Sequence, residues 1–347
     1  MRPVFRIGIT PDFYTDVKGL FEEELERMLG GRPGVEYAPM PPQPDKLATP
    51  EALDEVDGVL ALSLRFARES LRGVERLAVV ARWGVGFDKI DVAALTEADV
   101  ALAITPGAVR RPVAEAILTL LFALSKNLFA LDRATRAGRW RSELAGPAFD
   151  LAGSVLGSLG CGNIAREMFR LARPLGFARL IACDPFVKPE EVAGLGVELV
   201  DLETLFRESD CVTVNIPLNE ATRGFIGERH FRLMKPTALF INTARGAIVD
   251  HQALVRALEE RWIRGAGIDV FPTEPPPKDD PLLALDNVIL APHALAWTAG
   301  LFRDNTREAC RNLLAVARGD PPESLVNPEV LARPGFQRKL ARFRGDS

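Results

Sequence analysis

The glycine-rich segment Gly160-Cys161-Gly162-Asn163-Ile164-Ala165 constrains the fold of this chain more than any other feature. It follows Val155–Leu159, which has the length and composition of a buried strand, and it opens the helical pattern of Ala165–Leu175. In this setting the pattern G-x-G-x-x-G/A is typical of the first turn of a dinucleotide-binding sheet. The sequence therefore predicts a doubly wound α/β domain that contains this segment.

Each glycine of the segment has a physical reason in a dinucleotide site. Gly160 permits the tight turn, and Gly162 lets the backbone approach a pyrophosphate. The N-terminus of the following helix offers unpaired N–H groups and a partial positive charge. Ala165 stands where close packing of the helix on the strand tolerates a methyl group. Gly84-Val85-Gly86 is no such fingerprint, because Lys89 stands at its third position.

Asp184 closes the next expected strand, 24 residues after Gly160 (184 − 160). A carboxylate there can accept hydrogen bonds from both ribose hydroxyls and repels a 2′-phosphate, so the sequence favours NAD over NADP. The simpler interpretation of Asp184 is a turn cap before Pro185. The spacing of the fingerprint favours the ribose.

The whole chain alternates short apolar strands with helical segments, which predicts parallel sheets covered by helices. Up to about residue 105, helices are expected at Glu22–Leu29 and Leu71–Arg76, and strands at Val4–Ile9, Gly58–Leu62, Ala78–Arg82 and Ala101–Ile104. A second series of six strands is expected at Val155–Leu159, Leu180–Cys183, Cys211–Asn215, Ala238–Asn242, Gly265–Asp269 and Val288–Leu290. The apolar run 114–131 suits a buried helix between two domains, and a last helix over about 297–318 can return the chain to the first domain.

Composition narrows the class of protein. A formal net charge of -4 argues against a nucleic-acid-binding protein, and the four cysteines lack metal-ligand spacing. The N-terminus has no signal-peptide core, and the run 114–131 is too polar to span a membrane. We therefore expect a cytoplasmic protein with no metal, membrane or nucleic-acid partner. The basic tail 332–347 is interpreted as a solvated terminal segment, and His230 and His251 as helix-surface residues.

Arg245, Glu274 and His293 each follow an expected strand in the last third of the chain. Histidine suits proton transfer near neutral pH, and arginine can grip a carboxylate with its fork of donors. A carboxylate bonded to the second ring nitrogen would fix the histidine tautomer and favour the imidazolium. Together these residues are the parts needed to reduce a carbonyl beside a carboxylate.

Several segments resemble the D-isomer-specific 2-hydroxyacid dehydrogenase family over about residues 58–328. They are W-G-V-G-F-D-K-I-D (83–91), T-P-G (105–107), V-A-E (113–115), G-S-L-G-C-G-N-I-A (157–165), M-K-P-T-A-L-F-I-N-T-A-R-G-A-I-V-D (234–250), G-I-D-V-F-P-T-E-P (267–275) and N-V-I-L-A-P-H (287–293). The resemblance implies a flavodoxin-like substrate-binding domain, residues 1–106 with 298–347, and a Rossmann NAD-binding domain, residues 107–297. It also implies that the active site lies in the cleft between these two doubly wound parallel-sheet domains.

The resemblance also assigns roles to residues. The family's catalytic histidine, its carboxylate partner and its substrate arginine fall on His293, Glu274 and Arg245. Cofactor-binding positions fall on Gly160, Gly162, Asn163, Ile164, Ala165, Asp184, Ile216, Pro217, Thr243, Ala244, Asp269 and Ala296. The loop around Val85 and Gly86 would cradle the substrate carboxylate. Because members are commonly homodimers joined through their NAD-binding domains, the loop 138–153 with Trp140 is expected at that interface.

The pattern departs from the family just after His293. The family often continues with H-x-G-A, whereas Leu295 replaces the glycine here and Trp297 replaces a small residue. Trp297 either narrows the substrate site or packs at the start of the last helix, and both interpretations stay open. Arg65 lies where members contact the substrate and is a candidate second cation. These departures bear on the substrate and leave the reaction unchanged.

The reaction implied is hydride transfer between NAD(H) and a small 2-oxo or 2-hydroxy acid, as in glyoxylate/hydroxypyruvate reductases or phosphoglycerate dehydrogenases. A phosphite dehydrogenase-like oxidoreductase is the alternative within the fold. A formate enzyme is disfavoured, since Pro292 stands where those enzymes place glutamine. An alternative of another class is a dinucleotide-sensing protein that resembles transcriptional corepressors.

Overall fold

The computed structural model of the chain describes residues 3–17, 19–143 and 147–344. Residues 144–146 of the expected interface loop lie outside the described residues. The chain divides into two compact units. Unit 1 contains the residues up to Val109 and those from Thr298 onwards, and unit 2 contains Arg110–Trp297.

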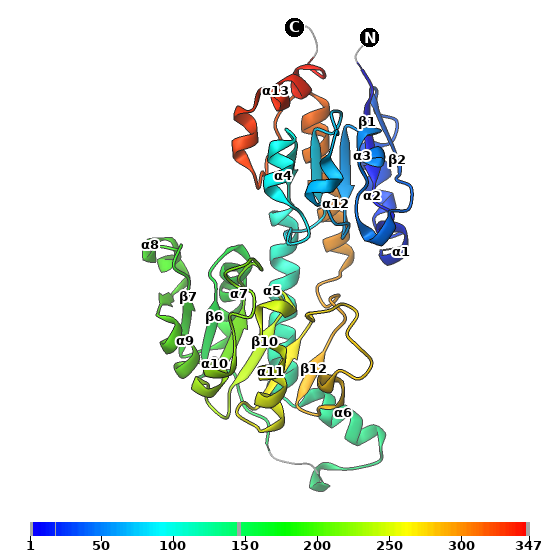
Figure 1. Ribbon diagram of the computed structural model, residues 1–347. Helices are drawn as coiled ribbons and strands as arrows, with labels where there is room; N and C mark the ends of the chain where they lie inside the picture. Colours follow the sequence, from blue (N-terminus) through cyan, green and yellow to red (C-terminus); the bar gives the residue numbers. More distant parts are fainter. Residues whose placement is uncertain (1–2, 18, 144–146, 345–347) are drawn as a thin grey trace. The chain divides into compact units, whose positions relative to one another are not determined.

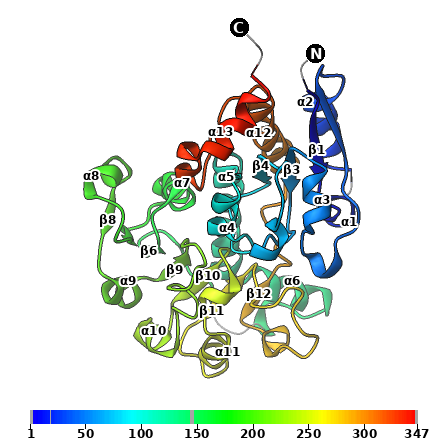
Figure 2. The same ribbon diagram turned by 45° about the horizontal axis from the view of Figure 1, so that its top comes forward.

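Unit 1 is built on a parallel five-stranded sheet in the order β2-β1-β3-β4-β5, the strand order of flavodoxin-like folds. The strands are β1 (Phe5–Ile9), β2 (Val35–Pro39), β3 (Gly58–Ala61), β4 (Val79–Arg82) and β5 (Ala101–Ala103). One face packs on α1 (Asp12–Asp16), α2 (Glu22–Leu29), α12 (Ala299–Ala317) and α13 (Pro334–Ala341). The other face packs on α3 (Pro50–Asp54) and α4 (Val92–Glu97), as Figures 1 and 2 show.

Unit 2 is built on a parallel seven-stranded sheet in the order β12-β11-β10-β9-β6-β7-β8. The strands are β6 (Val155–Leu159), β7 (Arg179–Cys183), β8 (Val197–Leu199), β9 (Cys211–Val214), β10 (Leu239–Asn242), β11 (Gly265–Ile268) and β12 (Val288–Leu290). The order reverses between β6 and β9, and ligands of such sheets bind beyond the carboxyl ends of the strands at that point. The prediction of two doubly wound parallel sheets is confirmed.

Helices cover both faces of the second sheet (Figure 1). One face packs on α5 (Pro106–Ser125), α7 (Asn163–Ala172) and α8 (Pro189–Val192). The opposite face packs on α9 (Leu202–Glu208), α10 (Glu228–Leu233) and α11 (His251–Glu259). Because both faces are buried, the central strands are continuous apolar runs, which is why the sequence shows them so clearly.

Two strands were missed, and one expected helix is wrong. The missed strands β2 and β8 lie at sheet edges and carry exposed polar side chains, so neither forms an apolar run. The helix expected at Leu71–Arg76 is instead a single 3₁₀ turn, Arg68–Leu71. Gly73, with a φ of 74°, takes the left-handed conformation that ends it.

The apolar run 114–131 is divided between two helices. α5 ends at Ser125, Asn127 adopts a left-handed φ of 52°, and α6 (Leu128–Arg136) begins there. Among the described residues, no single helix is long and apolar enough to cross a membrane, and only the α5 and α6 pair, bent by 57°, meets the length and composition together. Ala114, Ile117, Leu120 and Leu121 of α5 pack in the core of unit 2.

The C-terminal tail is wrongly expected to be solvated. Its helix α13 places Phe336 and Leu340 in the core of unit 1, and Phe343 follows them. The Lys339 ammonium donates to the carbonyls of Leu77, Ala98 and Asp99, and burial lowers its pKa to about 8. Lys339 therefore holds the tail to the backbone beside β4 and β5.

His230 is also not a surface residue. Its ring is buried between Phe206 and Phe225, at centroid distances of 5.0 and 5.7 Å. Its Nδ1 accepts a hydrogen bond from the Gly227 N–H (3.1 Å), and burial lowers its pKa. His251 is half-buried and pairs with Asp280 at 3.0 Å. Both rings have structural partners in unit 2.

Replacement of Phe336 by alanine tests whether the tail is part of the core. The ring is fully buried, so its loss should reduce the free energy of unfolding of unit 1 by about 3–5 kcal/mol. Urea denaturation followed by circular dichroism measures this change. Arg338→Ala, at an exposed position of the same helix, is the control and should leave the transition almost unchanged. Equal stability of the two variants would show that the tail does not contribute to the core.

Candidate active site

Arg245 lies in a short turn at the carboxyl end of β10. The last residue of that strand, Asn242, is buried, and its side-chain amide donates to the Arg245 carbonyl (2.9 Å). The Asn242 side-chain oxygen accepts the N–H of Ala244 (3.0 Å). One guanidinium nitrogen of Arg245 donates to the Ala244 carbonyl (2.7 Å). The predicted cofactor residues Thr243 and Ala244 therefore form the turn that carries Arg245.

Gly246 explains why glycine follows the arginine. A Cβ atom at this position would lie 2.1 Å from the carbonyl carbon of Phe271 and 2.4 Å from the nitrogen of Pro272. Real Cβ atoms essentially never come that close to backbone, so only glycine allows this contact. The turn that carries Arg245 therefore packs directly on the backbone of Phe271 and Pro272, shortly before Glu274.

Glu274 and His293 form a hydrogen-bonded pair. The His293 Nδ1 lies 3.0 and 2.9 Å from the two carboxylate oxygens, and one of these also accepts the Phe271 N–H (3.1 Å). Burial alone would raise the pKa of Glu274. The bond to His293, its charge, the Phe271 N–H and the charge of Arg245 outweigh that effect, so the pKa is lowered. Both side chains remain partly open to solvent, at 42% for His293 and 37% for Glu274, so an external molecule can reach them.

His293 stands in a strained turn that Asp269 stabilises. Its φ is 56°, which is uncommon for a residue with a side chain. The next two N–H groups, of Ala294 and Leu295, donate to one oxygen of the Asp269 carboxylate (3.1 and 3.3 Å). Burial raises the pKa of Asp269, although these two bonds and the nearby His293 lower it in part. Asp269, predicted to contact the cofactor, thus also fixes the turn of His293.

The structure brings the three predicted catalytic residues to one edge of one sheet. Arg245, Glu274 and His293 follow β10, β11 and β12, which are consecutive neighbours in the sheet. Carboxyl ends of parallel strands meet at the same edge, so turns that are far apart in sequence become adjacent. The Asp269 N–H also donates to the Asn242 carbonyl (3.0 Å), which links the end of β10 to the end of β11.

The glycine turn at the end of β6 has the expected geometry. Gly160 has a φ of 92°, and a Cβ there would lie 2.5 Å from the carbonyl oxygen of Asn215. Gly162 precedes α7 with open space where a Cβ would stand, and Ala165 is fully buried in the core. Asn163 and Ile164 open the helix. The turn therefore leaves room for a ligand at the N-terminus of α7.

Asp184, at the end of β7, bonds to this turn. One carboxylate oxygen accepts the Cys161 N–H (2.8 Å), and the other accepts the Phe186 N–H (2.9 Å). The predicted turn-cap interpretation is therefore present in the structure, and it does not use the remaining lone pairs that a ribose would need. Ile216 and Pro217 follow β9, and the Ile216 side chain packs close to Gly160.

The predicted substrate loop belongs to unit 1. Val85 and Gly86 lie in the turn after β4, where Arg82 donates to the carbonyls of Gly86 (2.9 Å) and Trp83. The Gly84 N–H donates to the Thr105 hydroxyl (2.7 Å), which fixes the turn to the end of β5. Arg65 is exposed, and its backbone pairs with Lys46 and Ala48. The sequence analysis did not predict the role of Arg82, whose two bonds here go to backbone carbonyls.

The two departures from the family pattern differ in environment. Leu295 packs against the core that α5 and α7 share, so it replaces glycine for a packing reason. Trp297 is exposed, and its backbone N–H donates to the Ala294 carbonyl (2.9 Å). Ala296 lies half-buried between them.

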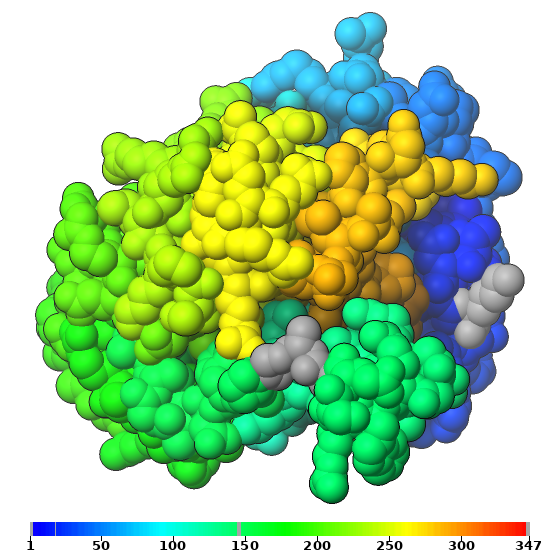
Figure 3. All heavy atoms as spheres, turned by 90° about the horizontal axis from the view of Figure 1, so that it is seen from below, coloured from blue at the N-terminus to red at the C-terminus, as the bar shows by residue number. Residues whose placement is uncertain are grey.

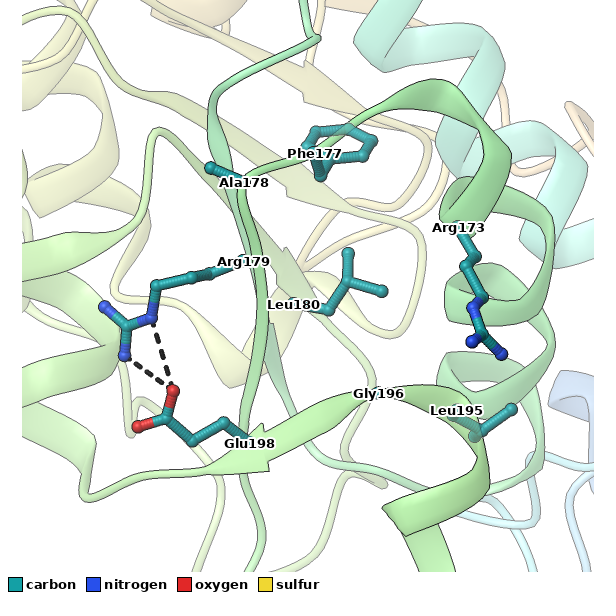
Figure 4. A pocket seen from close by; sticks show the side chains of 8 residues that line it. All are labelled: Arg173, Phe177, Ala178, Arg179, Leu180, Leu195, Gly196 and Glu198. Carbon is teal, nitrogen blue, oxygen red and sulfur yellow. Dashed lines mark hydrogen bonds and ion pairs between the residues drawn. The ribbon is translucent and has the colours of Figure 1, made fainter.

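Unit 2 also has a cavity of about 250 Å³ away from these residues. It lies between the end of α7 and the amino ends of β7 and β8, and Figure 4 shows the Arg179 guanidinium paired with Glu198 at its wall. None of the predicted site residues lines it. In the described part of the chain, no group of three or more potential metal ligands occurs.

Comparison with known proteins gives consistent matches. Residues 118–294 match the model of the NAD-binding domain of D-isomer specific 2-hydroxyacid dehydrogenases. A glyoxylate reductase of Korarchaeum cryptofilum is 38% identical over 300 residues, which is 85% of this chain and 90% of that protein. A glyoxylate reductase of Thermococcus litoralis is 36% identical over 298 residues, 84% of this chain and 89% of its own. The crystal structure of a glyoxylate reductase from Paecilomyes thermophila is 29% identical, with a TM-score of 0.81 over 94% of this chain and 99% of that one.

Proposed function

The chain belongs to the D-isomer-specific 2-hydroxyacid dehydrogenase family, and from this premise we propose that it reduces glyoxylate, or a 2-oxo acid of similar size, with NADH. It is an oxidoreductase that acts on the CH–OH group of its substrate, interconverting a 2-hydroxy acid and a 2-oxo acid. The observation that carries the proposal is the Glu274–His293 pair at the edge of the sheet where Arg245 also lies. The glyoxylate reductases among its relatives support the choice of substrate.

The residues divide the chemistry of carbonyl reduction between them. A bound nicotinamide supplies the hydride that the carbonyl carbon receives. His293, held at Nδ1 by Glu274, has Nε2 left to give a proton to the carbonyl oxygen. The lowered pKa of Glu274 keeps its carboxylate ionised, so it remains an acceptor for Nδ1 and fixes the orientation of the ring. Arg245 binds the substrate carboxylate and draws electron density from the adjacent carbonyl.

The glycine turn and Asp184 support a nicotinamide dinucleotide as the cofactor. The open space at Gly162 and the N-terminus of α7 suit a pyrophosphate. We propose that the Asp184 carboxylate accepts hydrogen bonds from the ribose hydroxyls of the cofactor, and that its negative charge disfavours the 2′-phosphate of NADPH. Asp269, Ile216, Pro217, Thr243, Ala244 and Ala296 are proposed to line the rest of the cofactor site.

We further propose that the protein is a homodimer joined through unit 2. Exposed apolar side chains gather on the end of α5 and on α6, namely Phe122, Leu128, Phe129 and Leu131. Trp140, which is 64% exposed, follows them. Figure 3 shows the segment around α6, coloured between cyan and green, standing out from the surface. A contiguous apolar surface of this kind is typical of a buried interface.

The four cysteines agree with a cytosolic location. All four are unpaired thiols, and Cys161, Cys211 and Cys310 are buried. Burial raises their pKa, to about 12 for Cys211 and Cys310, so they are poor thiolates. Unpaired, unreactive thiols suit a reducing compartment.

Oxidation of NADH tests the reaction and its substrate. We expect turnover with glyoxylate, less with bulkier 2-oxo acids, and loss of kcat by about 10²–10⁴-fold in His293→Ala while NADH still binds. Glu274→Gln should reduce kcat as well, because the ring loses its fixed tautomer. Rates are followed at 340 nm against glyoxylate, hydroxypyruvate, pyruvate and phosphohydroxypyruvate. Inactivity across this panel would contradict the proposal and favour a phosphite dehydrogenase-like enzyme or a dinucleotide-sensing protein. An unchanged kcat in His293→Ala would show that His293 is not the proton donor.

Asp184→Ala tests the cofactor preference. We expect the ratio of kcat/KM for NADH over NADPH to fall by about 10–100-fold, since hydrogen bonds to a charged group and a repulsion of phosphate are lost together. Asp201→Ala is the control, because Asp201 also bonds backbone and hydroxyl groups, at the start of α9. An unchanged ratio in Asp184→Ala would mean that another residue recognises the ribose.

Sedimentation velocity tests the homodimer. We expect the native protein to sediment as a dimer and Phe129→Glu to sediment as a monomer, because a buried charge without a partner is strongly unfavourable. Leu283→Glu, at an exposed apolar position elsewhere in unit 2, should remain dimeric. A monomeric native protein would refute the proposal, and loss of the dimer in both variants would refute the assignment to α6.

A further inference from the structure

Asn242 is a buried polar residue that no role in the proposed reaction accounts for. It is the last residue of β10 and is 1% exposed, so it lies out of reach of a bound ligand. Both polar atoms of its side chain are bonded, and both bonds go to the turn that carries Arg245. Because both side-chain hydrogen bonds of this buried amide go to one turn, holding that turn is the role that its contacts indicate.

We propose that Asn242 is a positioning residue that sets the direction in which Arg245 leaves the sheet. The amide nitrogen holds the Arg245 carbonyl at 2.9 Å, and the amide oxygen holds the Ala244 N–H at 3.0 Å. The side chain therefore closes a ring around residues 242–245. The inference rests on the proposed function, because it needs Arg245 to bind the substrate carboxylate.

The two bonds from Asn242 hold the backbone of the turn at residues 244 and 245. The Ala244 N–H donates to the Asn242 side chain at 3.0 Å, and the Arg245 carbonyl also accepts the Ile248 N–H at the longer distance of 3.3 Å. The backbone of Arg245 is extended, with φ −146° and ψ 139°. Without the amide, rotation about the bonds of residues 243 and 244 would change the starting point of the arginine side chain.

The far side of Arg245 is fixed independently. Gly246 touches the backbone of Phe271 and Pro272 so closely that no side chain fits. Arg245 thus lies between two fixed points, the amide of Asn242 before it and the contact of Gly246 after it. A guanidinium that binds a carboxylate through two parallel bonds tolerates little error in direction, so both points bear on catalysis.

Asparagine alone among the amino acids meets the demands of this position. The site needs a donor for one backbone carbonyl and an acceptor for one backbone N–H, at the reach of a two-carbon side chain. Aspartate supplies only acceptors and would face the Arg245 carbonyl with a negative charge. Alanine supplies neither and leaves the Ala244 N–H without its partner.

The first test compares Asn242→Ala and Asn242→Asp with the native enzyme. We expect kcat/KM for glyoxylate to fall by about 10–100-fold in both, with the larger part in KM, while the Kd of NADH measured by fluorescence changes less than threefold. Asn287→Ala is the matched control: its amide nitrogen also bonds backbone, donating to the carbonyls of Leu258 and Arg264, but at the amino end of β12, the opposite edge of the sheet. It should lower Tm without changing KM. If the Asn242 variants lose NADH binding and Tm together, or match Asn287→Ala, the residue serves the fold in general and the proposal is wrong.

A double-mutant cycle with Arg245→Ala separates this proposal from the proposed function. If Asn242 acts through Arg245, Asn242→Asp should cost at most about twofold in kcat/KM once the arginine is absent. Equal costs in both backgrounds would overturn the positioning role while leaving Arg245 in place. If Arg245→Ala itself leaves the KM for glyoxylate unchanged, the assignment of Arg245 fails, and with it the premise of this inference.

Discussion

The active-site chemistry depends on the parallel register of three neighbouring strands. β10, β11 and β12 run in the same direction, so the turns that leave them meet at one edge although their residues are far apart in sequence. The bond of 2.9 Å between Glu274 and His293 can form only because β11 and β12 pair in this register. A change of register by one residue would move every side chain of the strand to the other face of the sheet, and the pair would be lost.

Buried polar side chains hold the turns at this edge of the sheet, and so fix the directions of the side chains that those turns carry. Asn242 and Asp269 each end or follow a strand, and each bonds backbone N–H groups of the turn that carries Arg245 or His293. An unbonded polar group in such a place would cost free energy, so each side chain holds its turn firmly. The left-handed conformation of His293 is stable for this reason, since the two N–H groups after it have a common acceptor.

The sequence predicted the parts of the protein that local patterns encode. The central strands, the glycine turn and the three strand-end residues were placed correctly, because each is defined by residues close together in the chain. The edge strands β2 and β8 were missed because one flank of each is open to solvent and their patterns are mixed. The tail was misinterpreted because its contacts, such as Lys339 with the Leu77 carbonyl, join segments far apart in sequence. Asn242 escaped notice because its partners are backbone atoms, which look the same in every sequence.

Asp184 shows how one side chain can couple recognition to structure. Its carboxylate bonds the Cys161 N–H of the glycine turn and the Phe186 N–H beyond β7, so the residue proposed to select the ribose also joins the two segments that surround it. A neutral replacement would remove the charge that is proposed to disfavour a 2′-phosphate and, in the same step, the acceptor that holds the glycine turn.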